Sequence, residues 1–199
     1  LKVELEDWQR LGVEGHLHGR NPWLYYHHFF SKSISKLVGA KESEVVVMNS
    51  LTVNLNLMLI SFYRPVGKRN KILIQANEFP SDYYAFEQQI KLHGLKPEEC
   101  IIEVMPQNGE VTLHTEDILQ KIEQHKDELA LVMWSAVNYY TGQYFEIKKI
   151  SEACCKHKII FGLDLAHAIG NVELKLHEWN IDFATWCSYK YLNSGPGGV

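Results

Sequence analysis

The feature that most constrains the fold is an alternation, from about residue 40 onward, of short apolar runs with longer stretches of helical pattern. Strands that alternate with helices form a mainly parallel sheet whose two faces are covered by helices. The sequence therefore predicts an α/β fold. The apolar, mostly β-branched runs predict strands at residues 45–48, 71–75, 101–104, 129–133, 159–163 and 183–187.

Proline, glycine and capping residues mark where the helices between these strands begin and end. One helix begins near Thr52 and ends before the next proline, because the residue before a proline disfavours the helical conformation. A second begins near Pro80, which the first turn of a helix tolerates, and closes at Gly94. Thr115 is expected to cap a third helix that has acids in its first turn, and a fourth covers about 146–157.

Composition and charge narrow the class of protein. The chain has 199 residues, of which 46% are hydrophobic, and this is enough for a sizeable core. A formal net charge of −4 gives no reason to expect nucleic acid or an anionic membrane as a partner. No apolar run approaches the roughly 18 residues of a membrane span, and the first residues are acidic where a secretory signal would be basic. The cysteines form no CxxC pair, which favours reduced thiols in a cytoplasmic protein: Cys100, Cys154, Cys155 and Cys187.

Polar and ionisable residues follow most of the predicted strands closely. In open sheets of parallel strands, ligands bind outside the carboxyl ends of the strands. We therefore expect these side chains to meet at one edge of the sheet. They are Thr52 after the first strand, Phe79 and Asp82 after the second, Ser135 after the fourth, Asp164 after the fifth, and Tyr189 and Lys190 after the sixth.

A lysine and an aspartate on this edge have the chemistry that pyridoxal phosphate requires. Lys190 lies between two tyrosines, before a glycine-rich loop, and a lysine amine can form a Schiff base with the aldehyde of the cofactor. Asp164 ends an apolar run, and an aspartate can hold the pyridine nitrogen protonated so that the ring accepts electrons. The alternatives are a surface lysine and an aspartate that caps the following turn. His167 either lies beside this site or is a structural histidine.

Other residues suit the phosphate and the ring of this cofactor. Residues 49–54 place hydroxyl side chains between a strand and a helix, where backbone N–H groups bind phosphate. The hydroxyls of Ser135 and Tyr189 are further candidates. Phe79 precedes Pro80, which holds its backbone extended and suits a ring stacked on a flat cofactor. A phenylalanine of the hydrophobic core is the alternative.

Two further features predict no site. The histidines at positions 16, 18, 27 and 28 lack regular ligand spacing and a carboxylate partner, so we predict no metal site. The glycines of residues 195–198 come after the lysine, and no GK[ST] sequence follows them, so this run is not a Walker loop.

Five motifs together resemble kynureninase, a family of pyridoxal-phosphate hydrolases of the aspartate-aminotransferase fold type. The combination of Asp164, His167 and Lys190 is shared with related aminotransferases and desulfurases. The runs at 79–82 and 171–174 are more specific to kynureninase. The motifs span nearly the whole chain and lie at residues 49–55, 78–82, 140–143, 164–172 and 186–193.

The resemblance implies a role for each residue of the cofactor site. Lys190 would carry the cofactor and later move a proton at the substrate Cα. Asp164, helped by Asp82, would face the pyridine nitrogen, and Phe79 would stack on the ring. Tyr189 would contact the cofactor and could donate a proton. The remaining residues of the cofactor shell are Leu51, Thr52, Pro80, Ser81, Ser135 and His167.

The resemblance also implies how the chain is organised. Residues 1–38 would contribute to the substrate side, where His16 matches a residue near substrate, although His18 and residues 20–21 depart from the family pattern. Residues 39–199 would form an incomplete cofactor-binding large domain, truncated at the C-terminus, because family members continue for a similar length into a small domain. The family acts as a homodimer whose active site takes groups from both subunits.

The implied activity is hydrolysis of L-kynurenine, or of its 3-hydroxy form, to an anthranilate and L-alanine in tryptophan catabolism. Two alternatives remain open. One is a cysteine desulfurase or an aminotransferase of the same fold, and the other is a non-catalytic fragment that keeps the fold.

Overall fold

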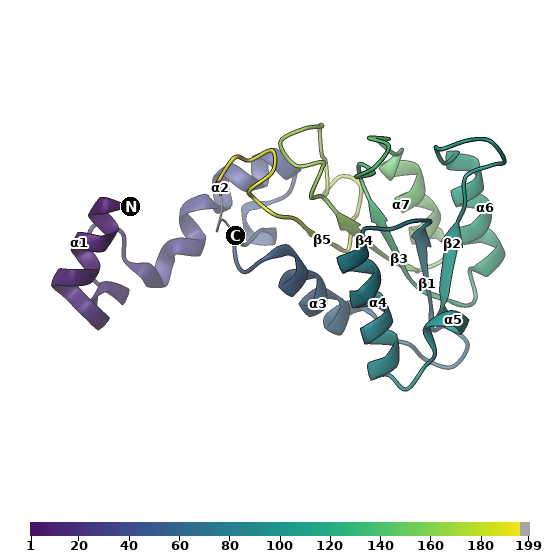
Figure 1. Ribbon diagram of the computed structural model, residues 1–199, viewed down its shortest axis with the longest axis horizontal. Helices are drawn as coiled ribbons and strands as arrows, with labels where there is room; N and C mark the ends of the chain where they lie inside the picture. Colours follow the sequence, from purple (N-terminus) through teal and green to yellow (C-terminus); the bar gives the residue numbers. More distant parts are fainter. Residues whose placement is uncertain (196–199) are drawn as a thin grey trace.

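The computed structural model describes residues 1–195, and its core is a single parallel sheet (Figure 1). Within these residues five strands lie in the order β2-β1-β3-β4-β5, and every neighbouring pair is parallel. The predicted α/β fold is confirmed. The strands are β1 (Lys71–Gln75), β2 (Ile101–Val104), β3 (Leu129–Ser135), β4 (Ile160–Asp164) and β5 (Phe183–Thr185).

The bounds of these strands agree closely with those predicted from the sequence, and the differences lie at the strand ends. The strands predicted at 71–75 and 101–104 have the predicted bounds. β3 ends two residues later than predicted, and β4 is displaced by one residue toward the C-terminus. Ser135 and Asp164 are therefore the last residues of β3 and β4, and they pair with each other in the register. β5 ends at Thr185, before the predicted end at 187. Residues 196–198 of the glycine-rich run lie outside the described residues.

The strand predicted at residues 45–48 is wrong, because the segment pairs with no other strand in the part of the chain that the structure describes. Its apolar, β-branched composition is typical of a strand, but a strand also needs a neighbour to bond its backbone. A groove of about 560 Å³ adjoins this segment. Residues 45–48 line one part of this groove, and Phe183, Ala184 and Thr185 of β5 line another.

Helices cover both faces of the sheet, as strands buried on two sides require. Ile72 and Ile74 of β1 pack with α3 (Leu51–Phe62), α4 (Pro80–Leu92) and α5 (Pro97–Cys100). Leu73 lies on the opposite face, in the larger core cluster that includes α6 (Thr115–His125) and α7 (Ile147–Lys156). β3, in the middle of the sheet, is buried along its whole length.

The helix predictions are confirmed with small changes at the ends. α3 begins at Leu51, one residue before the expected start, and α4 ends at Leu92, before Gly94. Thr115 is not the N-cap of α6: it is the first helical residue, and the extended residue before it, His114, occupies the cap. The side chain of Thr115 instead lies near Glu146, whose pKa is lowered by Lys149 and by Thr115.

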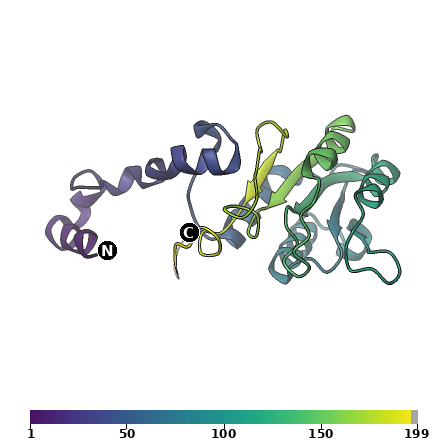
Figure 2. The ribbon, with the colours of Figure 1, turned by 90° about the horizontal axis from the view of Figure 1, so that it is seen from above.

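The N-terminal segment extends away from the sheet as an arm, which Figures 1 and 2 show from two directions. The arm contains α1 (Lys2–Leu11), which buries no residue, followed by η1 (Gly12–His16) and η2 (Trp23–Tyr25). α2 (Tyr26–Val38) leads back to the body, and Val38 at its end joins the larger core cluster. Among residues 1–195, no helix combines the length and apolar character that crossing a membrane requires.

Gly39 ends α2 and lets the chain turn tightly against the body. Its φ is +63°, and a Cβ at this position would lie 2.4 Å from the carbonyl oxygen of Leu174. Its own carbonyl accepts the backbone N–H of His177 at 3.0 Å. A residue other than glycine would therefore strain the backbone and displace the loop before β5.

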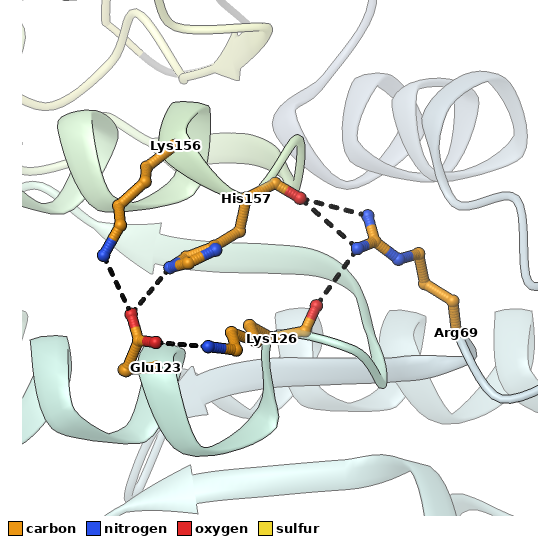
Figure 3. Close-up of polar contacts among 5 residues, drawn as sticks. All are labelled: Arg69, Glu123, Lys126, Lys156 and His157. Atoms are coloured by element: carbon orange, nitrogen blue, oxygen red, sulfur yellow. Dashed lines mark hydrogen bonds and ion pairs between the residues drawn. The ribbon is translucent and has the colours of Figure 1, made fainter.

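A polar network joins the loops at the amino ends of three strands (Figure 3). The guanidinium of Arg69, just before β1, donates to the carbonyl oxygens of Lys126, His157 and Lys158 at 3.0–3.3 Å. Lys126 precedes β3, and the other two acceptors precede β4. This single side chain therefore fixes the spacing of three loops at the edge opposite the predicted site.

Candidate active site

Four adjacent strands end in buried polar residues at one edge of the sheet. Gln75, Ser135, Asp164 and Thr185 are the last residues of β1, β3, β4 and β5, and each is at most 7% exposed. The strand order reverses between β1 and β3, which makes their carboxyl ends the topological switch point of the sheet. Open parallel sheets place their ligands there.

Three carboxyl groups are buried together at this edge. Asp82 on α4 is 1% exposed, while Asp164 and Glu78 are each 7% exposed. Burial raises the pKa of Asp82, and the neighbouring charges of Asp164 and Glu78 raise it further. Burial also raises the pKa of Asp164, against the backbone N–H of Ala166 and the charge of Lys190, which lower it. The ionised forms of these carboxyl groups are therefore disfavoured, and a further cation beside them would stabilise their negative charge.

Asp164 also caps a turn. Its Oδ1 accepts the backbone N–H of Ala166 at 2.8 Å, which is the capping role that the sequence left open as the alternative. This bond fixes one carboxylate oxygen at the end of β4. The capping role and a role toward a ligand are therefore compatible in the same side chain.

Lys190 lies between aromatic rings beside the acidic cluster. Its Nζ is 5.8 Å from the ring centroid of Phe79 and 5.9 Å from that of Tyr189, within the range of cation–π contact. Phe79 is 39% exposed and precedes the first turn of α4 in an extended conformation, so its ring is accessible at the strand ends. Tyr139, from the loop after β3, packs edge-on against Phe79 at 5.2 Å and 85°.

His167 and Tyr189 are influenced by the same neighbourhood. Burial lowers the pKa of His167, and the positive charge of Lys190 lowers it further. A hydrogen bond with the thiol of Cys187 raises the pKa of the Tyr189 phenol. The structure thus brings His167, Tyr189 and Lys190 together, although Tyr189 remains half exposed.

The N-terminus of α3 reaches the same edge. Leu51 is buried in a small cluster with Ala166 and Cys187, from the loops after β4 and β5. The N-cap residue Ser50 makes no side-chain cap, so the first N–H groups of the helix are available to a phosphate. Thr52, in the same turn, is exposed.

Glu78 is the buried group that the sequence analysis missed as a site residue. Its Oε1 accepts hydrogen bonds from the Gln75 amide, the Phe79 backbone and the Ser135 hydroxyl. Burial raises its pKa to about 7. Its position inside the 78–82 motif and before the stacking candidate is the signal that could have identified it.

The other predicted residues lie in different settings. Pro80 begins α4, and Ser81 donates to Oδ1 of Asp82 at 3.2 Å. His16 ends η1 in the arm, where its ring contacts Trp23 edge-on at 5.2 Å, so the structure does not bring it to the strand ends. Its role near substrate stays a prediction. Across residues 1–195, no group of three or more His, Cys, Asp or Glu is placed to hold a metal ion.

The donors and charges of this edge fit pyridoxal phosphate. A protonated ring nitrogen would neutralise part of the charge on Asp82 and Asp164, whose pKa values are raised. Thr185 pairs with Asp164 in the register, and its buried Oγ1 has no hydrogen-bond partner within the described residues. The open N-terminus of α3 suits the phosphate, and Lys190 presents a side-chain amine beside Phe79.

Comparison with known proteins shows which families this chain resembles. Residues 28–199 match the Aminotransferase class-V family. The kynureninase of Myxococcus xanthus is 55% identical over 100% of this chain and 47% of its own length, and that of Rattus norvegicus is 50% identical over 100% of this chain and 43% of its own. The resemblance to kynureninase is thus confirmed, and the chain spans about half the length of the curated relatives it matches.

Solved structures at low identity share the fold. A C-DES variant with glycine covalently linked to its PLP cofactor superposes with a TM-score of 0.77 at 13% identity, covering 99% of this chain and 50% of that one. This likeness shows the fold.

Proposed function

Because this chain belongs to the Aminotransferase class-V family, we propose that it is the cofactor-binding part of a kynureninase. The activity is hydrolysis of the Cβ–Cγ bond of L-kynurenine, or of 3-hydroxykynurenine, to an anthranilate and L-alanine. The observation that carries this proposal is the 55% identity to a kynureninase over the whole chain. The arrangement of Lys190, Asp164 and Phe79 supports it.

Bound pyridoxal phosphate supplies an aldehyde that links to amines and a ring that accepts electrons. Lys190 provides the amine that holds the cofactor and, when free, takes the proton from the substrate Cα. Asp164 and Asp82 hold a proton on the ring nitrogen from their buried positions. Phe79 offers its exposed ring as a stacking surface, and the phenol of Tyr189 is placed to donate a proton.

The open N–H groups in the first turn of α3 and the hydroxyl of Thr52 would hold the phosphate. Thr185 offers a hydroxyl at the end of β5, whereas the hydroxyl of Ser135 at the end of β3 donates to Glu78. His167 lies beside the same groups. These contacts would orient the cofactor toward the amine of Lys190 and the substrate.

We also propose a cytoplasmic homodimer. The arm exposes large apolar side chains, which a second copy of the chain would cover: Leu5, Trp8, Leu17, Leu24, Phe29 and Phe30. The same contact would carry His16 toward the site of the second copy. The four cysteines are free, as is usual in a reducing compartment.

A cysteine desulfurase of the same fold is less well supported, because the curated relatives that match the whole chain at 50% and 55% identity are kynureninases.

The test is to offer kynurenine, 3-hydroxykynurenine and cysteine to the full-length protein that contains this segment, loaded with pyridoxal phosphate. We expect formation of an anthranilate from one or both kynurenines and no sulfide from cysteine. Sulfide release without any anthranilate would favour the desulfurase, and neither product would favour a non-catalytic protein. Size-exclusion chromatography with light scattering tests the dimer on the same preparation.

A further inference from the structure

We propose that Glu78 is a positioning residue of this site, which orients the aromatic pair of Phe79 and Tyr139 and adds a negative charge beside Asp82 and Asp164. This inference rests on the proposed function. Glu78 precedes α4, in the connection from β1, and its side chain turns back beneath the strand ends. A buried carboxyl in this position is costly unless its oxygens are hydrogen-bonded.

One oxygen of Glu78 collects three donors from three parts of the fold. Its Oε1 accepts the Gln75 amide of β1 at 3.0 Å, the backbone N–H of Phe79 at 2.9 Å and the hydroxyl of Ser135 in β3 at 3.2 Å. The bond to Phe79 fixes the backbone of the residue whose ring faces Lys190. The bond to Ser135 uses the only proton of that hydroxyl, so the lone pairs of Ser135 are left to face a ligand as acceptors.

The network continues from Gln75 to the loop that carries Tyr139. The Oε1 of Gln75 accepts the side-chain amide of Asn138 at 3.2 Å. The Oδ1 of Asn138 in turn accepts the backbone N–H groups of Tyr140 and Thr141, each at 2.9 Å. Glu78 therefore holds one member of the aromatic pair directly and the loop of the other through two amide side chains.

The charge of Glu78 acts separately from its hydrogen bonds. In addition to burial, the charge of Asp164 on β4 raises the pKa of Glu78. The charges of Asp164 and Glu78 raise the pKa of Asp82 on α4, and the charge of Lys190, after β5, lowers the pKa of both aspartates. A negative charge on Glu78 would favour the cationic form of a nitrogen that lies beside the cluster. Removing that charge should lower the pH at which a bound cationic group loses its proton.

Two substitutions separate these effects in the full-length holoenzyme. Glu78→Gln keeps an acceptor for the three donors and removes the charge, whereas Glu78→Ala removes both. Glu152→Gln makes the same charge change on the exposed side of α7 and serves as the control. The measurements are the dissociation constant of pyridoxal phosphate and the pH midpoint of the absorption change of the bound cofactor.

For Glu78→Gln we expect cofactor affinity within about threefold of wild type and a lower pH midpoint. For Glu78→Ala we expect cofactor binding at least about tenfold weaker, because the three donors lose their acceptor. If Glu78→Ala fails to fold, the pH midpoint of Glu78→Gln still decides the question. If the Glu78 variants have the same pH midpoint and the same cofactor affinity as Glu152→Gln, the inference is overturned and the proposed function is unaffected. Failure of the wild-type protein to bind cofactor or cleave a kynurenine would instead overturn the proposed function.

Discussion

Acidic side chains at the two ends of the sheet have pKa values that are shifted in opposite directions. At the amino end, Glu123 is met by Nζ of Lys126 at 2.5 Å, Nζ of Lys156 at 3.2 Å and Nε2 of His157 at 2.7 Å (Figure 3). These cations hold the pKa of Glu123 down at about 2. At the carboxyl end, burial and like charges raise the pKa of Asp82 instead.

The difference separates a structural network from a binding site. The amino-end contacts satisfy one another, so nothing further is needed there. At the carboxyl end, Asp82 and Asp164 are buried and their pKa values are raised, so their charged forms are costly without a further cation. Such a cost persists where a ligand offsets it, and perturbed pKa values cluster at functional sites for this reason.

The strongest test of the comparison is Lys190, the cation at the acidic end. Replacing it in full-length holoenzyme, as Lys190→Ala, should reduce turnover by about a thousandfold or more, because both the anchor and the proton acceptor are lost. Borohydride reduction of the wild-type holoenzyme followed by peptide mapping should place the label on Lys190. A label on a different lysine would show that the site has been assigned to the wrong amine.

A smaller but still large effect is expected from Asp164→Asn. The amide can still accept the N–H of Ala166, so the turn should persist, but it cannot keep a ring nitrogen protonated. Loss of the partner of a buried cation costs on the order of 3–5 kcal/mol. At about 1.36 kcal/mol per decade of rate, turnover should fall roughly a hundredfold or more, with cofactor still bound. Turnover near that of wild type would reduce Asp164 to a turn cap.

Asp82→Asn should stabilise the cofactor-free protein in alkaline solution. Because the folded-state pKa of Asp82 is raised above its ordinary value, its favourable contribution is complete at low pH and is lost as pH rises through the folded pKa. The wild-type apoprotein should therefore melt at a lower temperature at pH 8 than at pH 6. The melting temperature of the variant should fall less over the same range of pH. One kcal/mol corresponds to roughly 2–4 °C for a domain of this size. Equal melting temperatures for variant and wild type at pH 8 would contradict the raised pKa of Asp82.

Much of the fold and site could be predicted from the sequence, because local patterns determine both. The strands at 71–75 and 101–104 follow from apolar runs, and the placement of Phe79 and Asp164 at strand ends follows from topology. Residues 45–48 have the same local signal and yet form no strand, because pairing depends on a partner that local sequence does not specify.

The site was harder to predict where function depends on contacts between distant segments. Nothing in the local sequence distinguishes Glu78 from an exposed acidic residue. The fold places Gln75 and Ser135 beside it, where both donate hydrogen bonds to its carboxylate. The position of His16 depends on the arm, which departs from the body. Neither its distance from the site nor the partner that would cover the arm follows from local periodicity.

The smallest effect is expected at the opposite end of the sheet, from Glu123→Gln. Exposed ion pairs contribute little, and the Arg69 bonds to three carbonyl oxygens remain in place without this carboxylate. Since the folded-state pKa of Glu123 lies near 2, below its ordinary 4.5, its contribution is complete above pH 4.5 and is lost as pH falls toward 2. The variant should therefore melt slightly below wild type at pH 7, and the gap should narrow as the solution is acidified below pH 4.5 or as salt is added. Turnover of the holoenzyme should not change. A loss of activity in this variant would mean that the amino-end network reaches the site, and the contrast between the two ends would no longer hold.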